Sequence, residues 1–201
     1  MAIEAPDERK VDRDPFVEFA RWYTAAVDVT ADRAAAMTVA TATADGRPSA
    51  RVVLLRGFDD RGFVFYTNYE SHKGREIAGN SAVAAVLYWH QLDAQVRIEG
   101  TAMRVSRAES EAYFAQRPRG HQIGAWASHQ SEPVSDRATL EAQVDAAEDE
   151  YPGAVPLPPH WGGYRIVPAR IEFWKSGTDR IHDRVEYARA GETWTTRRLS
   201  P

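Results

Sequence analysis

Residues 37–68, MTVATATADGRPSARVVLLRGFDDRGFVFYTN, constrain the fold more than any other part of the chain. Their β-branched and apolar runs are cut by ADGR and DDRG, two sequences typical of hairpin turns. The pattern predicts three strands in an antiparallel meander. Further strands are predicted over 82–89 and 94–105, and two or three more from Tyr164 to the end of the chain.

Four helices are predicted around these strands. In residues 14–29, apolar side chains from Phe16 to Ala26 recur three or four positions apart, as on one face of an amphipathic helix. Segments 71–80 and 106–116 begin with serine N-caps, and 135–151 carries another apolar stripe. The chain is therefore predicted to be mainly β with flanking α-helices: an antiparallel β-barrel. It is expected to be a single domain over residues 14–201, after a flexible tail over residues 1–13.

Composition narrows the functional classes. The 201 residues contain no cysteine, which excludes disulfides and a thiolate nucleophile and is typical of a cytoplasmic protein. There is no apolar run of about 18 residues, so no membrane span is expected. The N-terminus is charged and lacks the apolar run of a secretory signal. A net charge of −4 argues against general nucleic-acid binding, which needs a basic surface.

Several common catalytic patterns are missing. The chain has no G-x-G-x-x-G after a strand, no phosphate-binding Walker loop, no H-E-x-x-H and no G-x-S-x-G. The six histidines show no i, i+4 pair with a nearby acid, so no metal site is predicted.

Basic residues remain as the main chemical signal. In DRIHDRVEY, a strand would place Arg180, His182 and Arg184 on one face, with Ile181 and Val185 on the other. A solvent-exposed edge is the alternative interpretation. Three donors pointing one way favour an anionic or electron-rich ligand, because like charges two positions apart repel each other.

Three further groups support this interpretation. Arg51 and Arg56 bracket the apolar strand RVVLLR, and Lys73 lies at a predicted helix N-terminus, where free N–H groups attract anions. Arg117 and His121 follow a helix that carries a tyrosine. Each group alone has an ordinary explanation, as a strand end or a helix start. Together, on a chain of net charge −4, they predict two phosphate-sized sites.

With these residues identified, the chain resembles the pyridoxine/pyridoxamine 5′-phosphate oxidase family from about Met37 to the C-terminal RRLSP. The matching motifs are RVVLLR, FYTN, SHKGRE, QVRIEG, YFAQRPRGHQIGAWASHQS, PLPPHWGGYRI, IEFW and RIHDR, in the same order and spacing. The resemblance implies an FMN-binding split barrel that works as a homodimer, with each flavin held between the two subunits.

The resemblance also implies roles for individual residues. The FMN contacts fall on Arg51, Val52, Val53, Leu54, Leu55, Arg56, Tyr66, Thr67, His72, Lys73, Gln95, Gln130, Ser131, Trp174 and Arg184. The substrate-phosphate contacts fall on Arg56, Tyr113, Arg117 and His121. Arg180, Ile181 and His182 match the segment beside the substrate ring, and Arg180 and His182 are the candidate catalytic residues. On this basis RPRGHQ would hold the substrate phosphate, IGAWAS would allow close backbone approach, and HQS would reach the flavin phosphate.

The chain departs from the commonest family pattern at three of these positions. Arg56 stands where lysine is usual, His72 where arginine is usual and His121 where serine is usual. Arg56 keeps the charge, His72 weakens one phosphate contact at neutral pH, and His121 is a bulkier donor.

The expected activity is FMN-dependent oxidation of pyridoxamine or pyridoxine 5′-phosphate to pyridoxal 5′-phosphate, with O₂ as acceptor and hydrogen peroxide as product. Two alternatives stay open. One is an oxidase of the same fold that acts on another aromatic substrate, such as a phenazine precursor. The other is a flavin- or pyridoxal-phosphate-binding protein without turnover. The intact RPRGHQIGAW segment favours the vitamin substrate.

Overall fold

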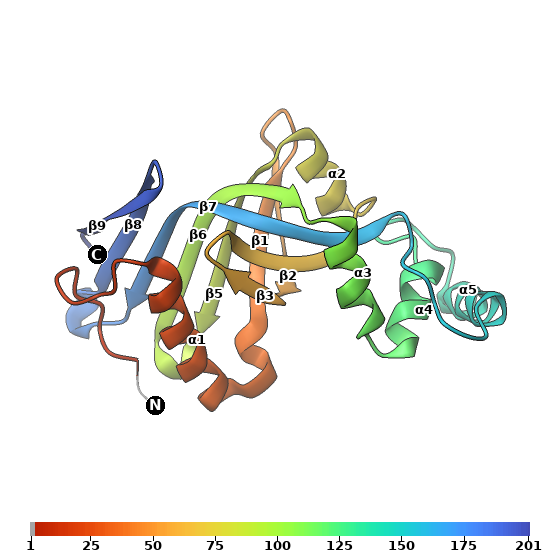
Figure 1. Cartoon of the computed structure of the whole chain (residues 1–201), viewed down its shortest axis with the longest axis horizontal. Helices are drawn as coiled ribbons and strands as arrows, with labels where there is room; N and C mark the ends of the chain where they lie inside the picture. The colour runs from red at the N-terminus through yellow and green to blue at the C-terminus, as the bar shows by residue number, and fades with distance from the viewer. Residues whose placement is uncertain (1–2) are drawn as a thin grey trace.

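The structure is a computed structural model that describes residues 3–201. Over these residues, nine strands form one sheet in which every pair is antiparallel. The strands are β1 (Ala36–Ala42), β2 (Pro48–Leu54), β3 (Gly57–Asp59), β4 (Gly62–Asn68), β5 (Ala82–Trp89), β6 (Ala94–Arg104), β7 (Trp161–Lys175), β8 (Asp183–Ala190) and β9 (Thr193–Arg198). The helices are α1 (Pro15–Thr30), α2 (His72–Gly79), α3 (Arg107–Ala115), α4 (Arg119–Ala127) and α5 (Arg137–Glu150). The predicted mainly β fold with flanking helices is confirmed (Figure 1).

The predicted three-strand meander is wrong. β1 pairs with β2 and β3 pairs with β4, but the sheet order is β2-β1-β5-β6-β7-β4-β3, so the two hairpins lie at opposite edges. Turn sequences specify which strands pair within a hairpin, whereas long-range pairing decides which hairpins become neighbours. The later strands β5, β6 and β7 fill the space between them.

β7 is the longest strand and the branch point of the sheet. One edge of β7 pairs with β6 along most of its length. The other edge pairs with β4 over residues 161–166 and with β8 over residues 170–175. Pro168 lies between these two segments and has no N–H to donate, so the ladder is interrupted where β7 changes partner.

Two hydrophobic clusters stabilise the chain. The larger one packs α1 against the sheet through Phe16, Phe19 and Trp22. α1 begins at Asp14, whose carboxylate accepts the Phe16 N–H at 2.9 Å, and Pro15 occupies its first turn. The smaller cluster joins α3, α4 and α5 to the first residue of β7, Trp161. The three helices therefore gather at one end of the sheet and the β8–β9 hairpin at the other (Figure 1).

The predicted N-terminal tail contacts the rest of the chain where it is described; its first two residues lie outside the described part. Ile3 is buried in the larger cluster, the Tyr187 hydroxyl donates to the Asp12 carbonyl at 2.7 Å, and Arg198 pairs with Glu8 at 2.9 Å. The domain boundary at residue 13 stays a prediction.

Candidate functional site

A buried lysine lies where β4 ends and α2 begins. Ser71 caps α2 by accepting the Gly74 N–H at 3.3 Å, and a side chain at Gly74 would lie 2.1 Å from the Tyr69 carbonyl oxygen. The serine and the glycine therefore allow α2 to start tightly against the preceding turn. This start places Lys73 inside the protein with only 7% of its surface exposed.

The Lys73 ammonium makes three hydrogen bonds, all to uncharged oxygens. It donates to Thr67 Oγ1 at 3.0 Å, to Ser71 Oγ at 3.2 Å and to Gln130 Oε1 at 3.2 Å. We call these four residues the Lys73 socket. Burial, with the nearby charge of Arg51, lowers the pKa of Lys73 to about 8. A cation held by neutral groups alone attracts an anion, so the socket fits a flavin phosphate.

Arg51 lies beside this socket and is held by side chains of β1, β2 and α2. It donates to Thr41 Oγ1 and Ser49 Oγ, both at 2.5 Å, and lies 3.3 Å from the buried carboxylate of Glu76. Glu76 also accepts from Thr41, from Ser49 at 2.7 Å and from His72 at 2.9 Å. Burial opposes ionisation of Glu76, but the hydrogen bonds from Thr41, Ser49 and His72 outweigh it and lower the pKa of Glu76 to about 2.

The remaining predicted FMN contacts of β2 divide by face. Val52 and Leu54 are exposed, Val53 shares the partly buried face of Arg51, and Leu55 is buried. The alternation follows from the period of two along a strand. The predicted contact His72 is 58% exposed, and its ring is directed to Glu76.

A cleft of about 480 Å³ contains the predicted substrate-phosphate residues. The cleft is lined by Arg56 from the link between β2 and β3, Tyr113 from α3, Arg117 from the turn between α3 and α4, and His121 from the first turn of α4. The rings of Tyr66 and Tyr113 stack at 3.8 Å, and the Trp161 ring lies nearly parallel to both, 5.6 Å from Tyr66 and 6.2 Å from Tyr113. Burial, with the charge of Glu109, raises the pKa of Tyr66 to about 12, so its hydroxyl stays protonated at neutral pH.

Arg117 is the most unusual residue of this cleft. Its guanidinium lies over the Trp161 ring at 4.5 Å, and its buried Nη1 has no hydrogen-bond partner among residues 3–201. Burial lowers the pKa of Arg117, and the charge of Arg56 adds to this effect. Buried polar atoms are nearly always paired, so an unpaired donor indicates a place for a ligand acceptor.

The segment after Arg117 is mostly helical. Residues 123–127 lie in α4, and Ile123, Ala125 and Ala127 are buried in the smaller cluster. The predicted close approach of residues 123–128 to a ligand stays a prediction. The small residues let α4 pack closely against its neighbours. In the sequence, the surrounding glutamines and arginines concealed this helical pattern. Gln130 does reach the Lys73 socket, and Ser131 beside it has a positive φ of 75°.

Gln95, Trp174 and Arg184 form a row across three strands. Gln95 pairs with Trp174 and Trp174 with Arg184 in the β6, β7 and β8 ladders. Arg184 Nε donates to the buried Glu172 at 2.7 Å, and this ion pair raises the pKa of Arg184. The predicted FMN contacts of the C-terminal region thus lie together.

The predicted strand over residues 180–182 is wrong. Thr178–Arg180 form a short 3₁₀ turn, β8 starts only at Asp183, and Asp179 and Arg180 have positive φ angles of 53° and 63°. Ile181 is 72% exposed and does not share a buried face with Val185. Hydrogen bonds inside the loop override the alternating pattern, because the Gly177 N–H donates to His182 Nδ1 at 3.2 Å.

This loop fixes the chemistry of His182. A side chain at Gly177 would lie 1.9 Å from the Ile181 carbonyl oxygen, so the loop requires glycine there. Because His182 Nδ1 accepts a backbone N–H, the neutral ring carries its proton on Nε2. The ring also lies 4.7 Å from that of Trp174.

The predicted phosphate residues and the predicted catalytic residues are not brought together within one chain. The cleft includes Trp161 at the start of β7, whereas Arg180 and His182 follow its other end. At about 3.3 Å per residue, the 13 residues from Trp161 to Trp174 span roughly 40 Å of extended strand. The two halves of the predicted site can meet only between two copies of the chain.

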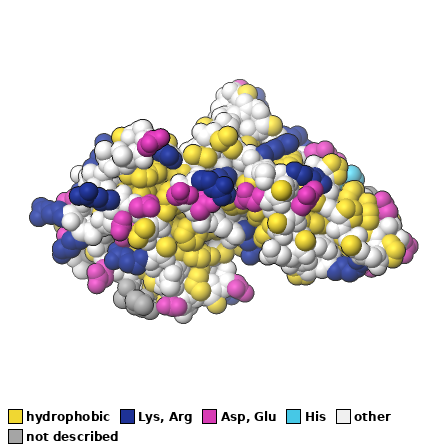
Figure 2. Space-filling model, in the orientation of Figure 1, with side chains coloured by type: hydrophobic (Ala, Val, Ile, Leu, Met, Phe, Trp, Pro, Cys, Tyr) yellow, Lys and Arg dark blue, Asp and Glu magenta, His cyan; other side chains and the backbone are white. Residues whose placement is uncertain are grey.

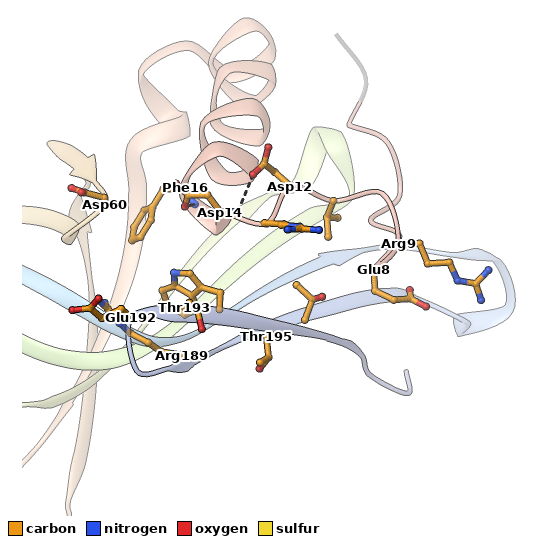
Figure 3. Close-up of a pocket in the computed structure, with 14 residues that line it drawn as sticks. Glu8, Arg9, Asp12, Asp14, Phe16, Asp60, Arg189, Glu192, Thr193 and Thr195 are labelled. Atoms are coloured by element: carbon orange, nitrogen blue, oxygen red, sulfur yellow. Dashed lines mark hydrogen bonds between the residues drawn. The ribbon is translucent and has the colours of Figure 1, made fainter.

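A larger concavity than this cleft lies elsewhere. A groove of about 960 Å³ separates the N-terminal segment from the β8–β9 hairpin (Figure 3). Trp194 and Phe16 contact each other there, and the rim mixes acids such as Asp12 and Glu192 with arginines such as Arg189. None of the predicted site residues lines this groove, so its size does not identify it as the site.

The distribution of charged and apolar side chains also bears on which ligands the chain could bind. On the face drawn in Figure 2, basic and acidic side chains are interspersed with apolar ones. Within residues 3–201, no cluster of three or more His, Asp or Glu residues is arranged to hold a metal ion. No helix in the described part of the chain is long and apolar enough to span a membrane.

The sheet and its flanking helices define an antiparallel split barrel, and comparison with solved structures agrees. PhzG from Burkholderia lata, in complex with tetrahydrophenazine-1-carboxylic acid, superposes with a TM-score of 0.91. It is 34% identical, and the match covers 99% of this chain and 98% of that one. A pyridoxamine 5′-phosphate oxidase-related, FMN-binding protein from Nostoc punctiforme shares the fold, with a TM-score of 0.77 at 15% identity, over 95% of this chain and all of that one.

Sequence comparison identifies the family. Residues 24–151 match the pyridoxamine 5′-phosphate oxidase family, and residues 161–201 match the C-terminal dimerisation region of pyridoxine 5′-phosphate oxidase. Pyridoxine/pyridoxamine 5′-phosphate oxidase from Rubrobacter xylanophilus is 55% identical over 96% of this chain and 90% of its own length. The protein of that name from Burkholderia lata is 52% identical over 97% and 92%. The chain belongs to the pyridoxine/pyridoxamine 5′-phosphate oxidase family, and this membership supports FMN as its cofactor and a homodimeric assembly.

Three residues beside the site were not predicted from the sequence. Glu76 and Glu172 each hold a predicted FMN-binding arginine, and Trp161 supports Arg117. Glu76 follows His72 by four positions. This spacing places both residues on one helix face, so the sequence contained a signal for their contact. Glu172 and Trp161 contact residues that are distant in the sequence, so no local pattern predicts their roles.

Proposed function

We propose that the chain is an FMN-dependent oxidase that converts pyridoxamine or pyridoxine 5′-phosphate to pyridoxal 5′-phosphate. The observation that carries the proposal is the buried, unpaired Nη1 of Arg117 in a cleft shared with Arg56, Tyr113 and His121. Two guanidinium groups, a phenol and an imidazole supply the number and kind of donors that a phosphate monoester needs.

FMN is the proposed cofactor, and the Lys73 socket is the proposed site of its phosphate. The support is the Lys73 ammonium, buried among neutral acceptors with Arg51 beside it. Bound there, FMN would supply two-electron redox chemistry between the substrate and O₂, which would take up two electrons and two protons to give hydrogen peroxide.

The residues of the chain bind and orient the substrate. Arg56 and Arg117 hold the substrate phosphate, while the stacked rings of Tyr66, Tyr113 and Trp161 exclude water from one wall of the cleft. Anchoring at the phosphate fixes the reacting carbon relative to the cofactor, which can supply several kcal/mol, about 7 at best, of the barrier.

Arg180 and His182 orient the substrate ring. The protonated Nε2 of His182 acts there as a hydrogen-bond donor, because Nδ1 is occupied by the Gly177 N–H. Since these residues follow the far end of β7, they reach a cleft from the second subunit. The match of residues 161–201 to a dimerisation region supports this arrangement.

The activity is tested with both phosphorylated substrates, by measuring hydrogen peroxide and the aldehyde absorbance of the product. The expected result is a yellow protein that releases one peroxide per aldehyde formed. A flavin-bound protein that forms neither product from either phosphate would exclude this oxidase activity and support a binding protein without turnover.

The shared site is tested by mixing subunits. Arg117→Ala and Arg180→Ala homodimers should both be weakly active, and mixed dimers should regain activity because one of their two sites has both arginines. If unfolding and refolding the two variants together restores no activity, the two residues belong to the same subunit's site or are not both needed.

A second candidate function is oxidation of a reduced phenazine carboxylic acid. It is favoured by the TM-score of 0.91 with the protein bound to tetrahydrophenazine-1-carboxylic acid, since a carboxylate could also pair with Arg117. The higher identity to the oxidases of phosphorylated substrates favours the first candidate. Comparing kcat/KM for pyridoxamine 5′-phosphate and for tetrahydrophenazine-1-carboxylic acid separates the two.

A further inference from the structure

Glu76 is a buried acid to which no role in the proposed reaction has been given. Its side chain is 5% exposed on α2, and both carboxylate oxygens are used. Oε1 accepts from His72 at 2.9 Å. Oε2 accepts from the hydroxyls of Thr41 and of Ser49, and lies 3.3 Å from Arg51 Nη2.

The two hydroxyls connect Glu76 to Arg51 in a fixed direction. Arg51 Nη1 donates to Thr41 Oγ1 and Nη2 donates to Ser49 Oγ. Each hydroxyl has one hydrogen, and each spends it on Glu76, so its oxygen lone pairs are left to face the guanidinium. Without an acceptor at Glu76, both hydroxyls could rotate and offer Arg51 a hydrogen in place of a lone pair.

Arg51 in turn packs against α2, the helix that carries Lys73, because its Nη2 lies 3.3 Å from Glu76, three positions after Lys73 and on the same helix face. Its charge accordingly lowers the pKa of Lys73. The main chain also limits Arg51, because Nη1 approaches the Val39 carbonyl at 3.4 Å. The guanidinium is therefore held on one side by β1, β2 and α2, with Lys73 as its basic neighbour.

We propose that Glu76 is a positioning residue for the flavin phosphate, which orients the hydroxyls of Thr41 and Ser49 so that Arg51 is held beside Lys73. This inference rests on the proposed function, because it takes the phosphate at the Lys73 socket to be that of FMN. Glu76 itself touches neither flavin nor substrate.

Two other roles for Glu76 make different predictions. If Glu76 only connects α2 to the β1–β2 hairpin, its loss lowers stability and weakens the binding of FMN and riboflavin equally. If Glu76 only neutralises Arg51, removal of its charge strengthens phosphate binding. A positioning role weakens binding of the phosphate-bearing flavin alone, and a neutral acceptor in the same place restores it.

The test compares FMN with riboflavin, which lacks the phosphate, on the full chain. The protein is purified with its flavin, dialysed to remove it, and titrated with each flavin while flavin fluorescence is followed. For Glu76→Ala, the Kd for FMN should rise about tenfold or more, the scale of losing a hydrogen bond to a charged group, and the Kd for riboflavin should not change. Glu76→Gln, which keeps an oxygen acceptor for the two hydroxyls, should bind FMN within about threefold of the original chain.

Glu18→Gln is the matched control. Glu18 is likewise a buried carboxylate, with the Trp22 indole at 2.7 Å and Arg21 as its arginine partner, but it lies on α1. The Glu18→Gln variant should leave the Kd of both flavins unchanged. The proposal is overturned if Glu76→Ala weakens FMN and riboflavin equally, if it leaves both unchanged, or if Glu76→Gln and Glu76→Ala both bind FMN more tightly.

Ser49→Ala and Thr41→Val keep the test decisive if Glu76→Ala does not fold. Each removes one hydroxyl and leaves Glu76 in place. Each should weaken the binding of FMN and leave the binding of riboflavin unchanged. Equal binding of FMN by these variants and the original chain would overturn the proposal. Failure of the proposed function looks different, because the original chain itself would then show no preference for FMN over riboflavin.

Discussion

The Lys73 socket and the Arg117 cleft both hold a buried cation, but they differ in how far its N–H groups are hydrogen-bonded. In the socket, the three N–H groups of Lys73 donate to Thr67, Ser71 and Gln130, and Arg51 beside it has an acid partner. In the cleft, Arg117 lies on an aromatic ring and keeps one buried donor unpaired. One site is complete without a ligand and the other is not.

The difference matches two kinds of ligand. A site with its polar atoms already paired is preorganised and loses little when a cofactor binds and stays. An unpaired buried donor costs about 1–3 kcal/mol, which is recovered only when an acceptor arrives. The cleft is therefore suited to a substrate whose phosphate must be recognised at each turnover. The predictions below test this contrast.

The largest effect is expected for Arg117→Ala. Losing a fork of donors to a phosphate should raise KM for pyridoxamine 5′-phosphate about 100-fold, near the upper limit for charge-assisted hydrogen bonds. The cofactor should stay bound, because its phosphate is proposed to lie at the Lys73 socket and not in this cleft. Steady-state kinetics and the flavin absorbance of the purified variant measure both effects.

Arg117→Lys is the control for this variant. Lysine keeps the charge but loses the planar fork and the stacking on Trp161, so it should recover only part of the lost affinity. Loss of flavin from either variant would contradict the separation of the two sites.

A smaller effect is expected for Lys73→Ala. FMN affinity should fall about 10- to 30-fold, because one charge-assisted contact is lost while Arg51 keeps its place. The KM for substrate should be unchanged when FMN is added in excess. An equal loss of riboflavin affinity would show that Lys73 does not bind the phosphate.

The contrast between the two sites also shows what the sequence could predict. Arg56, Tyr113, Arg117 and His121 were assigned to one phosphate from motifs, and the structure brings all four to one cleft. Motif order and local helix signals, such as Ser71 before α2, carried that information. Helices α1, α2, α3 and α5 and most strands were predictable for the same local reason, whereas α4 was not predicted.

The predictions that were wrong depended on contacts that strand alternation and turn sequences do not encode. The two hairpins of residues 36–68 lie at opposite edges of the sheet because β5, β6 and β7 pair between them, and no local pattern encodes this order. The loop at 177–182 was mistaken for a strand because alternation alone does not reveal the Gly177–His182 hydrogen bond. Likewise, the guanidinium of Arg117 lies over the ring of Trp161, which follows it by 44 positions in the sequence.

FMN binding should also depend on pH through Lys73. The pKa of Lys73 is about 8 in the flavin-free chain, and a bound phosphate raises it. Between about pH 7 and pH 8, the amine is charged before and after binding and the phosphate, whose second pKa is about 6, is a dianion, so affinity is constant. Above pH 8, binding must take up a proton, and FMN affinity should fall by up to about tenfold per pH unit. Riboflavin titrated over the same range should show no such fall, and Lys73→Ala should remove the pH dependence for FMN.

The smallest effect is expected for His72→Arg, which restores the residue usual at this position. His72 is 58% exposed and its Nε2 lies 2.9 Å from Glu76, so an arginine there would meet the same acid and remain largely in water. Exposed ion pairs contribute about 0.2–1 kcal/mol, so FMN affinity should change by no more than about fivefold. His72→Gln, which cannot carry a charge, should likewise stay within that range. Fluorescence titration of the three proteins with FMN measures the difference. A change as large as that of Lys73→Ala would mean that the socket is not complete without residue 72, and the contrast with the Arg117 cleft would fail on the cofactor side.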